Sequence, residues 1–174
     1  MSLPEIAIRP ALPGDAQAIC DIYAYHVAHG TATFDTEAPD VSFWEGKIAD
    51  IGGRGWPFLV AEGANGVLGY VYATQFRDRA AYAHTCENSI YVAENARGAG
   101  VGSRLLGELI AAARIAGFEQ MIAVAGGGEP ASVALHAKLG FVHAGRMRNV
   151  GFKFGRRLDT VYMQYDLTQG GLPQ

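Results

Sequence analysis

A glycine-rich turn between a strand and a helix constrains this chain most. The apolar run Ser89-Ile90-Tyr91-Val92 predicts a strand, and apolar residues recur close to every 3.6 positions from Val101 to Ala116, which predicts an amphipathic helix. Between them lies Arg97-Gly98-Ala99-Gly100-Val101-Gly102. Such a turn directs unpaired backbone N–H groups and the positive end of the helix dipole at one place. The pattern therefore indicates an α/β fold with an anion site, most simply a phosphate site.

The spacing of these glycines decides between known phosphate loops. A Walker turn needs a Lys followed by Ser or Thr, whereas Gly102 is followed by Ser103 and Arg104. A dinucleotide fingerprint needs the spacing G-x-G-x-x-G, and here the glycines lie two apart; Glu119, a candidate ribose carboxylate, begins the next strand instead of ending it. A nucleotide-dependent oxidoreductase is therefore a weaker alternative. A further alternative is a turn that only starts the helix and binds no ligand.

Length and composition favour a single soluble domain. The 174 residues are 49% hydrophobic and 18% charged, so we expect one domain over residues 1–174, with a frayed tail over residues 168–174. The formal net charge of -3 disfavours nucleic-acid and acidic-membrane partners. Cys20 and Cys86 have no metal-ligand or disulfide spacing, which predicts no metal site, and no targeting or membrane-spanning segment is visible. We therefore expect a cytoplasmic protein.

The order of predicted elements gives the fold class. Alternation, helical periodicity and turn residues predict a mixed, mostly antiparallel twisted sheet flanked by helices. Asp15 is the expected N-cap of the first helix. The expected strands are Ile6–Arg9, Pro57–Glu62, Val67–Gln75, Thr85–Val92, Met121–Ala125, Phe141–Arg148 and Leu158–Leu167, and the expected helices are Asp15–Val27, Phe43–Ile51, Val101–Ala116 and Pro130–Leu139.

Two motifs in this order resemble a known family. Arg97 to Gly102 reads Arg-x-x-Gly-x-Gly, which resembles the pyrophosphate loop of the GNAT superfamily of N-acetyltransferases. Ser132 precedes Leu135-His136-Ala137-Lys138-Leu139-Gly140-Phe141, which resembles the second hallmark of these enzymes. The predicted order of elements is also that of the GNAT fold. The resemblance implies acetyl-CoA as co-substrate.

Three further segments are similar to the phosphinothricin and methionine sulfoximine N-acetyltransferases. They are Thr33–Pro39, Arg79-x-x-Tyr82 with Thr85-Cys86-Glu87, and Gly151-Phe152-Lys153 with Gly155. This resemblance implies transfer of acetyl to the α-amine of a small amino-acid-like acceptor by a homodimer. Alternatives are an acetyltransferase acting on a peptide N-terminus or a polyamine, and a CoA-binding regulatory protein without turnover.

Glu87 and His136 are the candidate catalytic residues. Glu87 shares a strand face with Ser89 and Tyr91, and burial among apolar residues would raise its pKa toward the range of a general base. The alternative is a salt bridge from Glu87 to Arg77 or Arg79. His136 occupies the position at which many GNAT enzymes carry a Tyr that protonates the CoA thiolate; a packed helix histidine is its alternative.

The remaining candidate residues divide between cofactor and acceptor. The resemblance assigns Ile90, Tyr91, Val92, Arg97, Gly98, Ala99, Gly100, Val101, Gly102, Ser103, Glu129 and Ser132 to acetyl-CoA. Glu129 departs from the family, which usually has Asn there, and its charge would repel a diphosphate. The candidate acceptor residues are Phe34, Arg77, Arg79, Tyr82 and Lys153, because a planar guanidinium matches a carboxylate with two hydrogen bonds. A solvated loop is the alternative for Arg77 and Arg79.

Overall fold

The computed structural model describes residues 5–171, which form one seven-stranded sheet with the order β1-β2-β3-β4-β5-β7-β6. Within this range β4 and β5 pair in parallel and the other neighbours pair antiparallel. The predicted mixed, mostly antiparallel sheet is therefore confirmed. The strands are β1 (Ala7–Pro10), β2 (Phe58–Gly63), β3 (Gly66–Gln75), β4 (Thr85–Val92), β5 (Gln120–Gly126), β6 (Val142–Lys153) and β7 (Arg156–Asp166).

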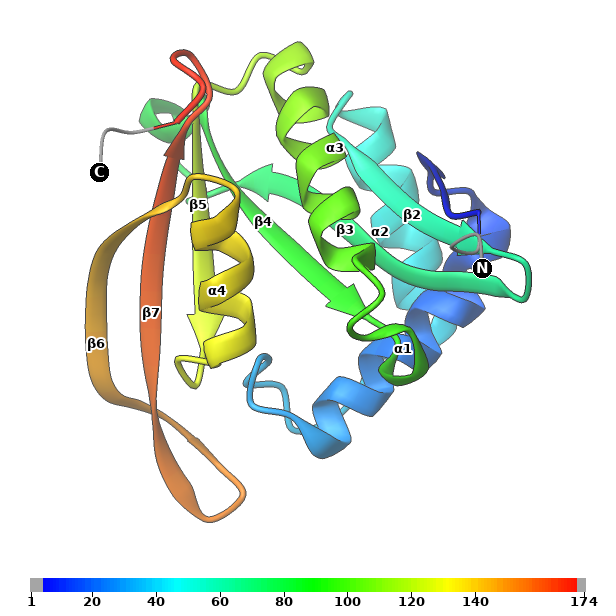
Figure 1. The fold of residues 1–174 in the computed structure, drawn as a ribbon, viewed down its shortest axis with the longest axis horizontal. Helices are drawn as coiled ribbons and strands as arrows, with labels where there is room; N and C mark the ends of the chain where they lie inside the picture. Colours follow the sequence, from blue (N-terminus) through cyan, green and yellow to red (C-terminus); the bar gives the residue numbers. More distant parts are fainter. Residues whose placement is uncertain (1–4, 172–174) are drawn as a thin grey trace.

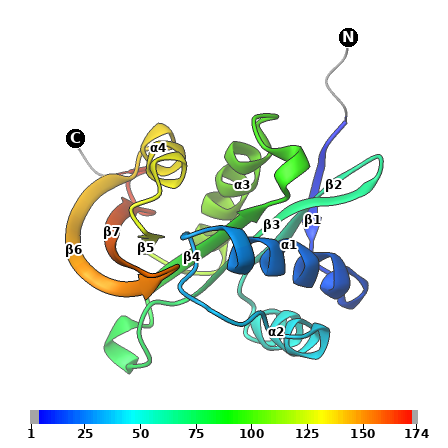
Figure 2. The same ribbon diagram turned by 90° about the horizontal axis from the view of Figure 1, so that it is seen from below.

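Helices cover both faces of the sheet, as Figure 2 shows. The helices α1 (Ala16–His29) and α2 (Val41–Gly53) lie on one face, and α3 (Val101–Ile115) and α4 (Pro130–Lys138) on the other. Because side chains alternate along β3, this strand contributes to the hydrophobic core on each face of the sheet. Val71 packs toward α3 with Leu105, while Tyr70 packs toward α1 and α2 with Trp44.

The two C-terminal strands form a longer hairpin than the sequence predicts. The prediction ended the first of them at Arg148 and began the second at Leu158. Asn149 has a φ of 57°, and the register shifts between Met147 and Gly151, after which pairing with β7 resumes. An irregularity of this kind bends a strand without ending it. The hairpin therefore extends to Lys153 and Arg156, the last pair before its turn.

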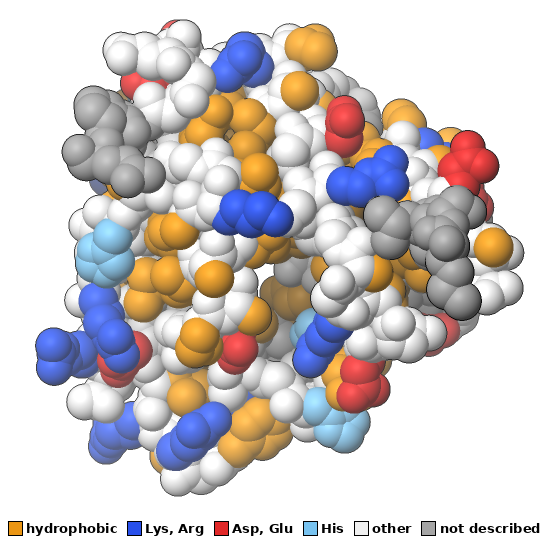
Figure 3. Space-filling model, in the orientation of Figure 1, with side chains coloured by type: hydrophobic (Ala, Val, Ile, Leu, Met, Phe, Trp, Pro, Cys, Tyr) orange, Lys and Arg blue, Asp and Glu red, His pale blue; other side chains and the backbone are white. Residues whose placement is uncertain are grey.

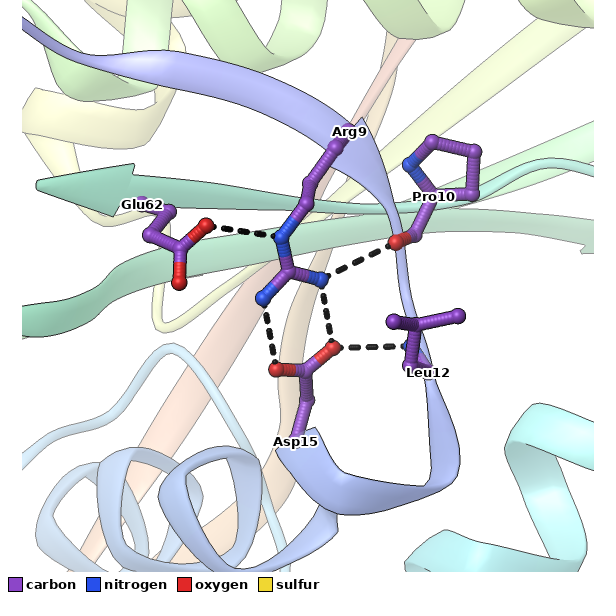
Figure 4. A network of polar contacts seen from close by, with 5 residues as sticks. All are labelled: Arg9, Pro10, Leu12, Asp15 and Glu62. Atoms are coloured by element: carbon purple, nitrogen blue, oxygen red, sulfur yellow. Dashed lines mark hydrogen bonds and ion pairs between the residues drawn. The ribbon is translucent and has the colours of Figure 1, made fainter.

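Asp15 holds the N-terminal strands to α1 in a way that the sequence did not predict. It occupies the N-cap position of α1, but its carboxylate caps no N–H group of that helix. Arg9 donates to Asp15 from Nη1 at 2.8 Å and Nη2 at 2.9 Å, and the Leu12 N–H donates to it at 2.7 Å (Figure 4). Arg9 also donates from Nε to Glu62 on β2. The guanidinium holds the pKa of Asp15 below its usual range.

The C-terminal segment forms a turn as far as the structure describes it. The backbone N–H and Oγ1 of Thr168 donate to Asp166 Oδ1, and the Gly171 N–H donates to the Asp166 carbonyl. Residues 172–174 of the predicted frayed tail lie outside the described residues. Among residues 5–171, the helices are too short or too polar to cross a lipid bilayer.

Candidate functional site

The site begins where β4 and β5 separate. Their parallel pairing ends at Asn88 and Ala123, although both strands continue. Figure 1 shows the two strands diverging from this point toward their C-terminal ends. Beyond it, β4 stays paired with β3 and β5 with β7. One edge of each strand therefore faces an opening in the middle of the sheet.

Backbone groups of Ile90 and Val92 face this opening. The Ala93 N–H donates to Leu68 on the far side, and alternation along an antiparallel strand turns the polar groups of Ile90 and Val92 the other way. His26 Nε2 on α1 donates to the Val92 carbonyl at 2.9 Å. Burial lowers the pKa of His26, which favours the neutral ring. The N–H groups of Ile90 and Val92 and the Ile90 carbonyl thus remain directed at the opening.

Two cavities meet at Ile90. The smaller, of about 270 Å³, contains Glu87, and the larger, of about 510 Å³, runs along the start of α3. Ala32, Ile90, Tyr91 and Ser132 line both. Figure 3 shows the molecular face hollowed between α4 and the first turn of α3. A ligand in one cavity can therefore reach a ligand in the other beside the open edge of β4.

The glycine turn forms one end of the larger cavity. Gly98 and Gly100 have φ angles of +77° and +80°, which L side chains rarely adopt, and a Cβ on either would meet nothing within 4 Å. Helical bonding begins where the Arg104 N–H donates to the Gly100 carbonyl, so the N–H groups of the three preceding helical residues have no helical acceptor. This donor set, at the positive end of the α3 dipole, suits a phosphate.

The predicted cofactor residues converge on the larger cavity. All of them except Ala99 are among its lining residues. Gly102 has a further reason to lack a side chain, because a Cβ there would lie 3.3 Å from Leu135 on α4. Arg97 and Glu129 place opposite charges on the same wall. The carboxylate of Glu129 thus opposes an anionic ligand where Arg97 attracts one.

Glu87 lies in the smaller cavity with its side chain 29% exposed. Burial raises its pKa, which Arg77 opposes from a distance of 4.0 Å between Nη1 and Oε2. This separation is beyond a hydrogen bond. The adjacent Cys86 points to the other face of the sheet and is fully buried in the core. A carboxylate with raised pKa and partial access to water is chemically suited to accept a proton.

His136 is held in the wall of the smaller cavity and is 3% exposed. Its Nδ1 lies 2.7 Å from the Ser132 carbonyl oxygen and its Nε2 lies 3.0 Å from Asn88 Oδ1, and a neutral ring can donate to only one of these two oxygens. Burial lowers the pKa of His136 and favours the neutral ring. A half-turn of the Asn88 amide would then let its N–H donate to Nε2.

The predicted acceptor residues are not all brought together. Phe34 lines the smaller cavity, whereas Arg77 lies outside its described wall, 4.0 Å from the Glu87 carboxylate. Arg79 and Tyr82 are exposed on the loop between β3 and β4 and are absent from the described cavity wall. Lys153 is 4% exposed and donates to two backbone carbonyls instead of facing the cavity. The Gly-Phe-Lys pattern suggested that Lys153 binds the acceptor. In the structure this lysine instead binds two backbone carbonyls.

Other lining residues were not singled out by the sequence. Asn88 follows Glu87 at the last rung of the parallel pairing, and Thr33 and Thr160 add hydroxyl groups to the smaller cavity. His26 and Thr31 line the larger one. A polar residue in the middle of a predicted strand was the available signal for Asn88, whereas Thr160 reaches the site only because β7 lies beside β5.

Comparison with known proteins agrees with this geometry. A model of the acetyltransferase (GNAT) domain matches residues 8–162. The chain is 46% identical over 164 residues to phosphinothricin N-acetyltransferase of Alcaligenes faecalis, covering 94% of this chain and 83% of that protein. It is 38% identical over 162 residues to an L-methionine sulfoximine/L-methionine sulfone acetyltransferase of Pseudomonas aeruginosa, covering 92% and 94%.

A solved structure shares both fold and sequence. The crystal structure of a phosphinothricin acetyltransferase from Sinorhizobium meliloti in complex with AcCoA superimposes with a TM-score of 0.90 at 43% identity, covering 92% of this chain and 88% of that one. The sheet opening, the glycine turn and these matches lead to one assignment. The chain belongs to the GNAT family of acetyltransferases.

Proposed function

We propose that this enzyme transfers the acetyl group of acetyl-CoA to the α-amine of a small amino-acid-like acceptor of the phosphinothricin, methionine sulfoximine or methionine sulfone type. The observation that carries this proposal is the junction of two cavities at Ile90, with Glu87 in the smaller one. Relatives named for these acceptors, and a similar structure containing AcCoA, support the substrate class.

Acetyl-CoA would occupy the larger cavity. The N–H groups at the start of α3 would receive its diphosphate, and the free backbone groups of Ile90 and Val92 would receive the pantetheine arm and the thioester. The Ile90 N–H is the proposed donor to the oxygen that gains negative charge during transfer. Arg97 and Ser103 would add contacts beside the turn, while Glu129 would turn its charge away from the diphosphate.

Glu87 is the proposed general base. The carboxylate takes a proton from the acceptor ammonium, directly or through water, and the amine nitrogen then attacks the thioester carbon. A C–N bond forms, the C–S bond breaks, and the amide nitrogen loses a second proton as the thiolate gains one. Because burial disfavours the charged ring of His136, we propose that His136 binds and orients groups at the junction and that water supplies the proton to the thiolate.

The walls of the smaller cavity suit a polar acceptor. Thr33, Ser89 and Thr160 line the smaller cavity with Glu87, and their hydroxyl groups suit the oxygen or nitrogen atoms of a sulfoximine, sulfone or phosphinate. Arg77 is the proposed partner of the acceptor carboxylate, because its guanidinium is half exposed and lies 4.0 Å from the carboxylate of the proposed base. Arg79 on the same loop is its proposed helper.

Release of the CoA thiol tests this assignment. Amino acids with such side chains should exceed their decarboxylated amines in kcat/KM by roughly ten- to a hundredfold, the value of one charge-assisted contact. Arg77→Met should reduce this preference, whereas Arg156→Met, which removes an exposed guanidinium on the β6–β7 hairpin, should leave it unchanged. Equal rates with the amines, or a loss of equal size for both classes in Arg77→Met, would favour the peptide or polyamine alternative.

We further propose that the enzyme is a cytoplasmic homodimer. Its two cysteines are free thiols, in keeping with a reducing compartment. The edge strand β6 and its turn expose Met147, Val150, Phe152 and Phe154. An apolar edge strand invites pairing with another chain, so this apolar edge of β6 is the proposed contact between the two copies.

A further inference from the structure

One buried cation has no part in the proposed chemistry. Lys153 ends β6, and its Nζ donates to the Gly30 carbonyl and to the Thr33 carbonyl, each at 2.9 Å. Lysine is seldom buried unless its charge has partners. Its two partners here lie about 120 positions earlier in the chain. The side chain therefore joins the C-terminal hairpin to the segment that leaves α1.

That segment separates the two cavities. Residues 30–34, which we call the dividing segment, follow the last residue of α1. Gly30 and Thr31 line the larger cavity, Thr33 and Phe34 line the smaller one, and Ala32 lines both. The position of these five residues thus sets the width of the acceptor cavity and of its junction with the other cavity.

A second residue of the hairpin, Gly151, packs closely against the same segment. A Cβ at Gly151 would lie 2.7 Å from Cζ of Phe34, a distance that real Cβ atoms essentially never show. The ring of Phe34 therefore needs a glycine beneath it. Because side chains alternate along a strand, Gly151 and Lys153 face inward, while Phe152 between them is 68% exposed. This arrangement explains why Gly, Phe and Lys occupy positions 151, 152 and 153.

Two further contacts define where the segment rests. Tyr23 Oη on α1 lies 2.7 Å from Thr33 Oγ1 and donates to Asp35 at 2.6 Å. At the end of β5, a Cβ on Gly126 would lie 2.7 Å from the Ala32 carbonyl oxygen. The dividing segment therefore packs directly on the backbone of β5. Lys153 and Gly151 contact the same segment from the β6–β7 hairpin.

We propose that Lys153 is a positioning residue for acetyl transfer: from the β6–β7 hairpin it holds the dividing segment against β5 and so places Phe34 and Thr33 around the acceptor. The proposal rests on the proposed function. Direct binding of the acceptor carboxylate by Lys153 does not fit, because two of its three ammonium donors bind backbone carbonyls and the side chain lies outside the described cavity wall.

Lys153→Met tests the proposal, because methionine keeps the length and removes the donors. Arg156→Met is the matched control: Arg156 pairs with Lys153 across the hairpin and is exposed. A displaced wall should cost roughly ten- to a hundredfold in kcat/KM for the acceptor, mainly through KM. The acetyl-CoA Kd should change less than about threefold, since most of the proposed phosphate donors lie on α3. Amide exchange in residues 30–34 should accelerate.

Gly151→Ala provides an independent disturbance that keeps the lysine. It should produce the same acceptor-specific loss, and the double variant should lose less than the product of the two, because both release one segment. If Lys153→Met does not fold, Gly151→Ala and amide exchange decide the matter. Unchanged exchange in residues 30–34, or equal losses for acceptor and acetyl-CoA, would overturn the proposal. A wild-type enzyme that acetylates none of these acceptors would refute the proposed function, whereas the exchange measurement would still test the contact.

Discussion

Glu87→Gln should affect activity and stability in opposite directions. Glutamine keeps the size of the side chain and its ability to accept hydrogen bonds, but it cannot take a proton from an ammonium group. The variant therefore removes the proposed base while leaving the walls of the smaller cavity in place. The proposed acetyl-CoA site is the other cavity, so the affinity for acetyl-CoA should stay within about twofold of the wild-type value.

The expected loss of activity follows from the position of the carboxylate. General-base catalysis contributes about 10²–10⁴-fold, or about 2.7–5.4 kcal/mol of transition-state stabilisation. The Glu87 side chain is 29% exposed, so water can reach its carboxylate. Because some unassisted transfer through that water can persist, we expect a loss of kcat near about 10²-fold, at the lower end of this range.

The stability effect has a sign that the structure determines. Burial raises the pKa of Glu87 in the folded protein, so the folded state binds its proton more tightly than the unfolded state. The stability of the wild type therefore decreases as pH rises from the unfolded pKa through the folded one. A glutamine does not ionise, so the variant does not lose this stability in this pH range. Above that window, Glu87→Gln should be the more stable protein, and below it the difference should shrink.

Two measurements on one preparation check both effects. The first is kcat against pH with saturating acceptor and acetyl-CoA, and the second is urea denaturation of both proteins across the acidic range. Arg77→Met is the companion variant, because it removes the cation that lowers the pKa of Glu87 and should move the acidic limb of the rate profile to higher pH. A loss of kcat below threefold, or a variant that is less stable at neutral pH, would refute the reasoning.

The remaining predictions concern the cofactor and the dimer. Gly100→Ala imposes a side chain at a φ of +80° and should weaken acetyl-CoA binding about tenfold by displacing several N–H donors, whereas Gly107→Ala in the middle of α3 should have no effect in the same calorimetric titration. Phe152→Asp places a charge in the proposed β6 contact and should yield monomers in sedimentation velocity; an unchanged mass would move the contact elsewhere.

Local sequence patterns predicted those features of the fold that neighbouring residues form among themselves. The glycine turn, the apolar period of α3 and the alternation of β4 are properties of neighbouring residues, so the sequence indicated the anion site and the placement of Glu87 and Cys86 on opposite faces. The extent of β6 was not predictable in this way, because its irregularity between Met147 and Gly151 is tolerated only through pairing with β7. The periodicity of one strand's sequence does not show whether a neighbouring strand will stabilise such an irregularity.

Lys153 shows the corresponding limit for the site. A lysine beside a loop of arginines is indistinguishable in sequence from a ligand for an anion, and the carbonyl groups that it binds carry no signal in residue type. Arg79 and Tyr82 illustrate a related limit, since the motif that they match does not show that their side chains are exposed on the loop between β3 and β4. Backbone acceptors and loop directions appear only when distant segments are brought together by the fold.

The alternation of β6 also connects the proposed dimer contact with the acceptor cavity. Phe152 points outward where a second copy would pack, while its two neighbours, Gly151 and Lys153, grip the dividing segment from inside. A strand is stiff over three residues, so a force on one face is transmitted to the other. Packing of a second copy on Phe152 would therefore restrain the dividing segment through Gly151 and Lys153. On this reasoning the apolar edge of β6 would serve the acceptor site as well as the proposed association of two chains.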